Sequence, residues 1–349
     1  MGHLHERYPD DSEAAVFHAL AILGVAYSSP PDETYARQLE AGAILNPILA
    51  AQPDHPGVAH YIIHSHDYPE LADRALDAAR RYAEIAPDAP HALHMPSHIF
   101  TRLGLWDESI ASNRAASSSA RKDGWVGEEL HTLDYLTYAY LQQGQEDDAR
   151  AILESLPTVE VGAANYFAGL YATAAIPARF AVERREWSEA AALEVSDDVF
   201  HGGSTCWAEA TLYYARGLGA ARTDQLELAK RSIADLEACK AALLQGGERL
   251  WADQVEVQRR AVAASVAWAE GDHERALTLM RSAADLEDTT DKHPVTPGAI
   301  IPARELLGEM LLETGKPAEA REAFEATLAM APNRARAIEG VERATRRSR

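Results

Sequence analysis

Apolar residues, mainly Ala and Leu, run along the whole chain with Glu and Arg between them, a composition that favours helix over strand. The clearest unit extends from Pro302 to Pro332, and Gly315 marks a tight turn near its middle. Two small residues, Gly308 and Ala320, stand where the two helices of such a hairpin approach closely. This stretch therefore predicts two helices joined by a short turn.

The same arrangement of turn and small residues recurs toward the N-terminus. It is found at 271–276, 186–190, 144–149 and 103–109, and the same frame fits 75–87 and 41–53. A degenerate copy lies at 222–229. We count about eight helical pairs, enough to stack a continuous core. Longer loops are predicted at 28–31 and 291–298, and no low-complexity linker interrupts the chain. We therefore predict an all-α, right-handed α-solenoid that forms one domain over residues 1–349.

Two histidine pairs share one internal spacing. His60 and His64 form the first pair, and His94 and His98 follow at the same spacing 34 residues later. Residues i and i+4 project from one face of a helix, so each pair is expected to present both imidazoles together on a single helix. Two neighbouring helices should then present four histidines in register.

Both the hairpins and several longer motifs carry a family resemblance. The hairpin over 300–333 closely resembles the tetratricopeptide repeat (TPR), which has a period of 34 residues. The segments HYIIH (60–64), HALHMPSHIF (91–100) and DKHPVTPG (291–298) resemble a widespread bacterial family of TPR proteins with no established activity, over nearly the whole chain. Members of that family carry a further N-terminal helical segment. The opening of this chain, 4–9, therefore looks like the middle of such a protein, which indicates a short variant or a shortened chain.

The TPR resemblance implies which side chains face the concave groove. In TPR proteins, set positions of the first helix of each hairpin face that groove, and the histidine pairs occupy such positions. The groove-facing positions of the three hairpins over 57–142 also include Asp67, His91, His131, Asp134 and Tyr138. A weaker alignment adds His18 from the first hairpin. The resemblance thus implies one polar wall made by three consecutive helices.

This wall has the residue types of a metal site. Imidazoles and carboxylates can converge on one ion, and a mixed set of the two suits zinc, iron or manganese. The predicted metal ligands are His60, His64, His94 and His98. Additional ligands, or hydrogen-bond partners of the ligands, are predicted among Asp67, Asp134 and Glu129. Two other interpretations stay open: a metal-free polar pocket, and histidines copied by repeat duplication that only pack between Ala-rich helices.

Three other motifs suggest local roles. Lys292 and His293 lie on a loop stiffened by two prolines, and they are predicted either to reach the groove edge as ligand-binding residues or to serve the turn. The tetrapeptide Ile-Pro-Ala-Arg occurs at 176–179 and 301–304, and we interpret it as a helix start in preference to an anion-binding arginine. The segment His201-Gly-Gly203 is predicted to be a loop without a phosphate-binding role, because no strand precedes it.

Charge and cysteine content narrow the class of protein. The formal net charge of −21 predicts repulsion from nucleic acid and from anionic membranes. No apolar stretch is long enough to span a membrane, and the first residues lack the features of a signal peptide, so we expect a cytoplasmic protein. Cys206 and Cys239 fit a reducing compartment, and we interpret them as free buried thiols that one helical hairpin would bring near each other.

Together these observations predict a ligand-binding protein with a His/Asp cluster on its concave face. It would be a metal-dependent enzyme acting on a small molecule if a water held an open coordination position. Asp67, His91, His131 and Asp134 would then be ligands or acid–base groups, with Tyr138 as a hydrogen-bond donor. The alternative is an interaction scaffold that grips a peptide in its groove, as most TPR arrays do. No oligomeric state follows from the sequence.

Overall fold

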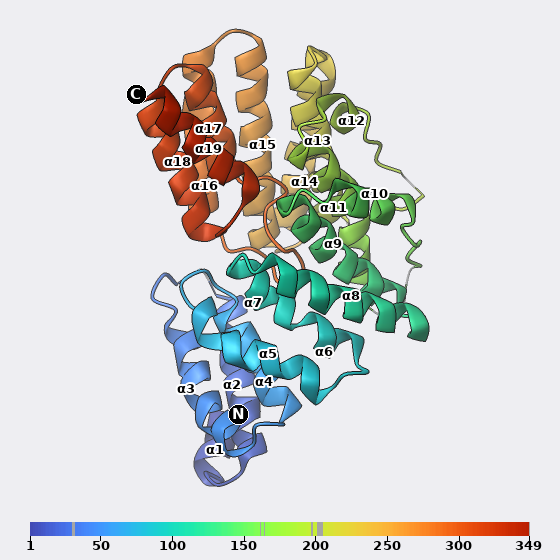
Figure 1. Ribbon diagram of the computed structural model, residues 1–349, viewed down its shortest axis with the longest axis vertical. Helices are drawn as coiled ribbons and strands as arrows, with labels where there is room; N and C mark the ends of the chain where they lie inside the picture. The colour runs from blue at the N-terminus through green and yellow to red at the C-terminus, as the bar shows by residue number, and fades with distance from the viewer. Residues whose placement is uncertain (30–31, 161, 164, 197, 201–204, 349) are drawn as a thin grey trace. The chain divides into compact units, whose positions relative to one another are not determined.

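The computed structural model describes residues 1–29, 32–160, 162–163, 165–196, 198–200 and 205–348. Within these ranges every regular element is a helix and no strand occurs, so the predicted all-α class is confirmed. Consecutive helices pair into TPR-like hairpins (Figure 1). The predicted loop at 28–31 lies partly outside the described residues, and the loop at 201–203 lies wholly outside them.

The chain forms two compact units, Met1–Gly124 and Trp125–Arg349, and each has a hydrophobic core of its own. The prediction that residues 1–349 form one domain therefore stays a prediction. Within the described part of the chain, none of the helices combines the length and the apolar character that crossing a membrane requires.

The first unit contains three hairpins, formed by α2 with α3, by α4 with α5, and by α6 and α7 with α8. Its helices are α1 (Gly2–Arg7), α2 (Ser12–Tyr27), α3 (Ala36–Ala51), α4 (Pro56–His66), the short 3₁₀ helix η1 (Ala72–Ala75), α5 (Leu76–Ile85), α6 (Pro90–His94), α7 (Pro96–Arg102) and α8 (Trp106–Asp123). The core between them is built mainly from Ala, Ile and Leu side chains of α2, α4 and α5. These small and aliphatic residues let the hairpins stack closely.

Pro96 divides the helix that was predicted to carry both His94 and His98. Proline has no backbone N–H and cannot continue the hydrogen-bond ladder, so α6 ends at His94 and α7 begins at Pro96. Met95, between them, keeps helical dihedral angles of φ −50° and ψ −38°. The prediction of a single helix was therefore wrong in detail, but the helical path is retained across the break.

The second unit contains five hairpins and a final helix. Its helices are α9 (Val126–Gln142), α10 (Glu146–Glu154), α11 (Tyr166–Glu183), α12 (Trp187–Ala191), α13 (Cys206–Arg222), α14 (Leu226–Gln245), α15 (Arg249–Ala269), α16 (His273–Asp288), α17 (Ala303–Glu313), α18 (Pro317–Met330) and α19 (Ala335–Arg347). Each odd-numbered helix from α9 to α17 packs against the helix that follows it, and α19 packs on α18. The described residues thus form eight hairpins, in line with the number predicted.

The last hairpin shows why small residues were required. Gly315 has φ +73° at the turn, a conformation that favours glycine. A Cβ on Gly308 would lie 2.7 Å from the Phe324 ring, and one on Gly340 would lie 2.5 Å from it. The close approach predicted for Gly308 is confirmed.

The repeated Ile-Pro-Ala-Arg tetrapeptide has two different structures. Pro302 immediately precedes α17, so the second copy is a helix start as interpreted. Pro177 lies inside α11, so the helix-start interpretation was wrong for the first copy. The arginine of that copy, Arg179, is buried and forms an ion pair with Asp134.

Candidate functional site

Five histidines of the first unit form one contiguous group, called the histidine cluster below. Ring centroids lie 4.8 Å apart for His60 and His64, and 5.0 Å apart for His94 and His98. The two pairs meet through His64 and His98, at 5.9 Å, and His91 contacts His60 at 5.1 Å. The structure therefore brings together the four predicted metal ligands and His91.

Within each pair the Nε2 atoms face each other. They are 3.0 Å apart in His60 and His64, and 3.2 Å apart in His94 and His98. Two imidazole nitrogens bound to one tetrahedral metal ion at about 2.0–2.1 Å would be about 3.3 Å apart. Both pairs are thus already near the spacing of two ligands that share an ion.

The Nδ1 atom of His94 donates a hydrogen bond to Asn113 of α8, with a distance of 2.7 Å to its Oδ1. The side-chain amide of Asn113 donates in turn to the backbone carbonyl of Ser109 at 2.8 Å, which assigns Oδ1 as the acceptor. The proton of a neutral His94 ring is therefore on Nδ1, and its Nε2 carries a lone pair.

His98 is held in the same way by a carboxylate. Its Nδ1 donates to Asp67 Oδ2 at 3.0 Å, and Asp67 Oδ1 accepts from Arg102 Nε at 2.8 Å. Asp67 is the residue that follows α4, so the end of one hairpin helix orients a ring on the next hairpin. In neutral rings the Nε2 lone pairs of His94 and His98 face each other, an arrangement that suits a positive charge between them.

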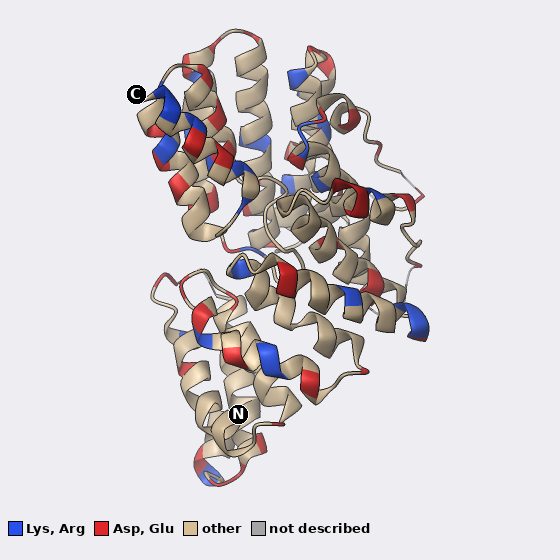
Figure 2. Cartoon of the chain, in the orientation of Figure 1, with Lys and Arg blue, Asp and Glu red and all other residues tan. Residues whose placement is uncertain are grey.

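His60 is kept neutral by its surroundings. Burial lowers its pKa to about 3, with smaller contributions from His64 and His91. Helices α4, α6 and α7, which carry the cluster, contain a single Lys, Arg, Asp or Glu residue, Arg102 (Figure 2). A neutral imidazole is the form that binds a metal ion, so His60 is ready to act as a ligand at neutral pH.

The residues of the histidine cluster differ in their exposure to solvent. His94, His98 and Asp67 are buried, whereas His60, His64 and His91 are half-buried. The described structure therefore leaves the edge formed by His60, His64 and His91 as the more exposed side of the cluster.

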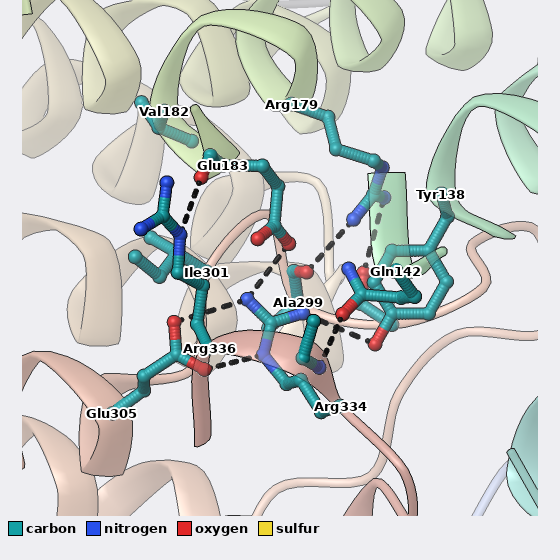
Figure 3. A network of polar contacts seen from close by, with 12 residues as sticks. Tyr138, Gln142, Arg179, Val182, Glu183, Ala299, Ile301, Glu305, Arg334 and Arg336 are labelled. Atoms are coloured by element: carbon teal, nitrogen blue, oxygen red, sulfur yellow. Dashed lines mark hydrogen bonds and ion pairs between the residues drawn. The ribbon is translucent and has the colours of Figure 1, made fainter. Parts of the chain in front are cut away.

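Asp134 and Tyr138, on α9 of the second unit, belong to a buried polar network around two arginines. Asp134 accepts from Arg179 at 3.1 Å, and burial raises the pKa of its carboxyl while Arg179 opposes that rise. The Arg179 guanidinium lies 4.9 Å from the centre of the Tyr138 ring and donates to the backbone carbonyl of Ala299 (Figure 3).

Arg334 is the second arginine of this network, and it is fully buried. It forms ion pairs with Glu305 at 2.6 Å and with Glu183 at 2.7 Å, and it donates to the Tyr138 hydroxyl at 3.2 Å (Figure 3). Buried charges of this kind are stable only when paired and hydrogen-bonded. The network gives Asp134 and Tyr138 structural partners, and their ligand-binding role stays a prediction.

The other predicted positions of the second unit are His131, Glu129, Lys292 and His293. His131 and Glu129 are buried on α9, and the His131 ring packs edge-on against Tyr135 at 5.4 Å. The His293 ring stacks on Trp251 at 4.9 Å, and burial lowers its pKa to about 4. His293 Nδ1 also accepts from the Val295 backbone N–H, which confirms the turn role. The groove-edge role of His293 and of half-buried Lys292 stays a prediction.

Three residues of the first unit, His18, Asn113 and Arg102, add to what the sequence predicted. The ring of His18 lies against His5, with centroids 5.6 Å apart, and its position in the groove stays a prediction. Asn113 and Arg102 hold the cluster but were not predicted. The sequence did hint at a role for Asn113. Asparagine is a poor helix former, yet this residue lies in the middle of the long helix α8.

No protein-family model matches this sequence, and no curated protein matches it. Among solved structures, the chain is similar to one in the APC/C hetero-tetramer Cut9–Hcn1, with a TM-score of 0.39 and 13% identity over 89% of this chain and 53% of that chain. This chain thus spans about half the length of that one. It is also similar to the TPR domain of P58(IPK), with a TM-score of 0.23 and 12% identity over 95% and 98% of the two chains. Likenesses this weak carry no information on activity or partners.

Proposed function

We propose that the histidine cluster binds a divalent transition metal, with zinc, iron or manganese as the candidates, and that the protein uses it to bind and transform a small molecule. One observation carries the proposal. The Nε2 atoms of His94 and His98 face each other while both Nδ1 protons are bound, one by Asn113 and one by Asp67. Metal-binding histidines typically donate their other ring N–H to a carboxylate or carbonyl oxygen in this way.

A proton is the other positive charge that could lie between the two Nε2 atoms. It would turn one buried ring into an imidazolium, which burial disfavours. Asp67, the carboxylate that binds His98, already shares its charge with Arg102. A metal ion satisfies both lone pairs at once and is the favoured occupant.

The second pair and the exposed edge suggest how a ligand would enter. His60 and His64 supply a further couple of facing nitrogens, and His91 adds a third half-buried ring on the same side. A metal with an open coordination position supplies a bound water that is nucleophilic at neutral pH. A small molecule would therefore approach from the edge formed by His60, His64 and His91. The cytoplasmic location and the exclusion of nucleic acid remain predictions.

Elemental analysis of untagged protein, purified without chelators, tests the proposal. We expect a near-stoichiometric transition metal in the unmodified protein and its loss in the double variant His60→Gln/His94→Gln. His273→Gln is the matched control, because His273 is exposed at the start of α16 and far in sequence from the cluster. A folded protein that contains no metal and takes up no zinc, iron or manganese would overturn the proposal, as would a double variant that keeps its metal.

The peptide-scaffold alternative has the opposite pH dependence. If the histidines grip an anionic peptide, binding strengthens below pH about 6.5, where imidazole gains charge. Metal binding weakens over the same range, because the ligands must be neutral. A panel of acidic peptides titrated into metal-free protein at pH about 5.5 and about 7.5 separates the two functions. Tighter peptide binding at the lower pH, lost in His60→Gln/His94→Gln, would favour the scaffold.

A further inference from the structure

The two cysteines of this sequence lie side by side in the second unit. Cys206 begins α13, Cys239 is on α14, and these two helices form one hairpin. The two Sγ atoms and a carboxylate oxygen of Glu209 all lie within 4.8 Å of one another. Glu209 is one helical turn after Cys206, so both project from the same face of α13. Three potential metal ligands thus converge between two packed helices.

The Glu209 side chain is buried in the second unit. Only 4% of the residue is exposed, and its oxygens accept from the hydroxyls of Thr205 and Tyr213. Across the ranges that the structure describes, no Lys, Arg or His forms an ion pair with it; the nearby Arg216 pairs with Asp235 instead. Burying a carboxylate that lacks a compensating positive charge is costly. A bound cation would remove that cost.

We propose that Cys206, Glu209 and Cys239 bind a thiolate-preferring divalent metal ion of the zinc type. In a tetrahedral zinc site with such ligands the donor atoms lie about 3.3–3.8 Å apart, a contraction that rotation of the side chains can supply. Binding releases two thiol protons: two thiols, one carboxylate and Zn²⁺ give a complex of net charge −1 and two H⁺. The fourth coordination position is left for a water or an external ligand.

The two thiols contact each other. Their hydrogen bond holds the pKa of Cys206 below its usual value and, together with burial, raises the pKa of Cys239. The thiolate is the form that coordinates a metal. The site differs from the histidine cluster in ligand type, because thiolates select softer metals than imidazole and carboxylate do.

Cobalt(II) is the most direct probe, because only a thiolate ligand gives the sulfur-to-cobalt charge-transfer absorption in the near ultraviolet. The experiment uses the full chain carrying His60→Gln/His94→Gln, reduced and kept free of oxygen, so that the histidine cluster does not contribute. We expect one Co²⁺ per chain with this absorption, and its displacement by Zn²⁺. Cys206→Ser/Cys239→Ser should abolish the absorption.

Glu209→Gln separates the three-ligand site from a simple thiol pair. It should keep the charge-transfer absorption and lower Co²⁺ affinity by about 10-fold or more. Asp235→Asn, a nearby carboxylate outside the site, is the matched control and should leave the affinity unchanged. The proposal is overturned if the reduced, folded protein shows no charge-transfer absorption, or if Glu209→Gln binds Co²⁺ as tightly as its parent.

Discussion

The Nε2 atoms of His94 and His98 face each other at 3.2 Å, and each ring is fixed from behind by an oxygen atom of another helix or loop. Both rings are therefore oriented before any ligand arrives. Ligands held in advance by such partners lose less freedom on binding, so the partners themselves should affect affinity.

Replacing Asn113 with leucine should weaken metal binding. Leucine has a similar volume but cannot accept the His94 Nδ1 proton, so the ring loses its fixed orientation. We expect metal affinity to fall about 10- to 100-fold and stability to fall by about 1–2 kcal/mol, because buried polar groups lose partners. Competition with a zinc chelator measures the first effect. Asn113→Asp keeps the acceptor and should bind within a few-fold of the original; equal affinity for Asn113→Leu would contradict the role given to this contact.

His60 should make the metal-free protein less stable in acid. Its pKa is about 3 in the folded state, well below the ordinary histidine value of 6.5. Below pH 6.5 His60 is protonated in the unfolded chain but stays neutral in the folded chain. Its contribution to the free energy of unfolding is therefore present above that pH and is lost progressively as pH falls toward 3. The slope should reach about 1 kcal/mol per pH unit for this half-buried ring.

Denaturant unfolding in chelator between pH about 7 and about 5 measures the slope. The variant His60→Gln cannot titrate, so its stability should fall less steeply over the same interval. Parallel curves for the two proteins would show that His60 takes up its proton in the folded state.

Replacing Arg334 with methionine should destabilise the second unit strongly. Arg334 is fully buried between Glu305 and Glu183, and its removal leaves two carboxylates without their common partner. Breaking a buried ion pair from one side costs about 3–5 kcal/mol. Calorimetric unfolding measures this loss. Arg304→Met is the control: Arg304 pairs with the exposed Asp285 and Asp288, and its loss should cost less than about 1 kcal/mol.

The hairpins and the shared face of each histidine pair were predictable because both follow from local spacing. Helix geometry places residues i and i+4 together, and a positive φ at Gly315 ends one helix and permits the next. The residues that hold the histidine rings in place were harder to predict from the sequence. Asp67 was anticipated as a supporting group, but Asn113 and Arg102 lie on other parts of the chain, and their contacts depend on how hairpins pack. Pro177 inside α11 shows the same limit, since tertiary packing overrode a local helix-start signal.

Every member of the histidine cluster, and each side chain that orients His94 and His98, is found between residues 60 and 113. Each of the two hairpins involved brings one pair of facing rings. A single duplication or deletion in the gene could therefore add or remove a whole pair of rings. A repeat protein of this kind can gain or lose metal-binding histidines one hairpin at a time. The solenoid fold stays the same when that happens.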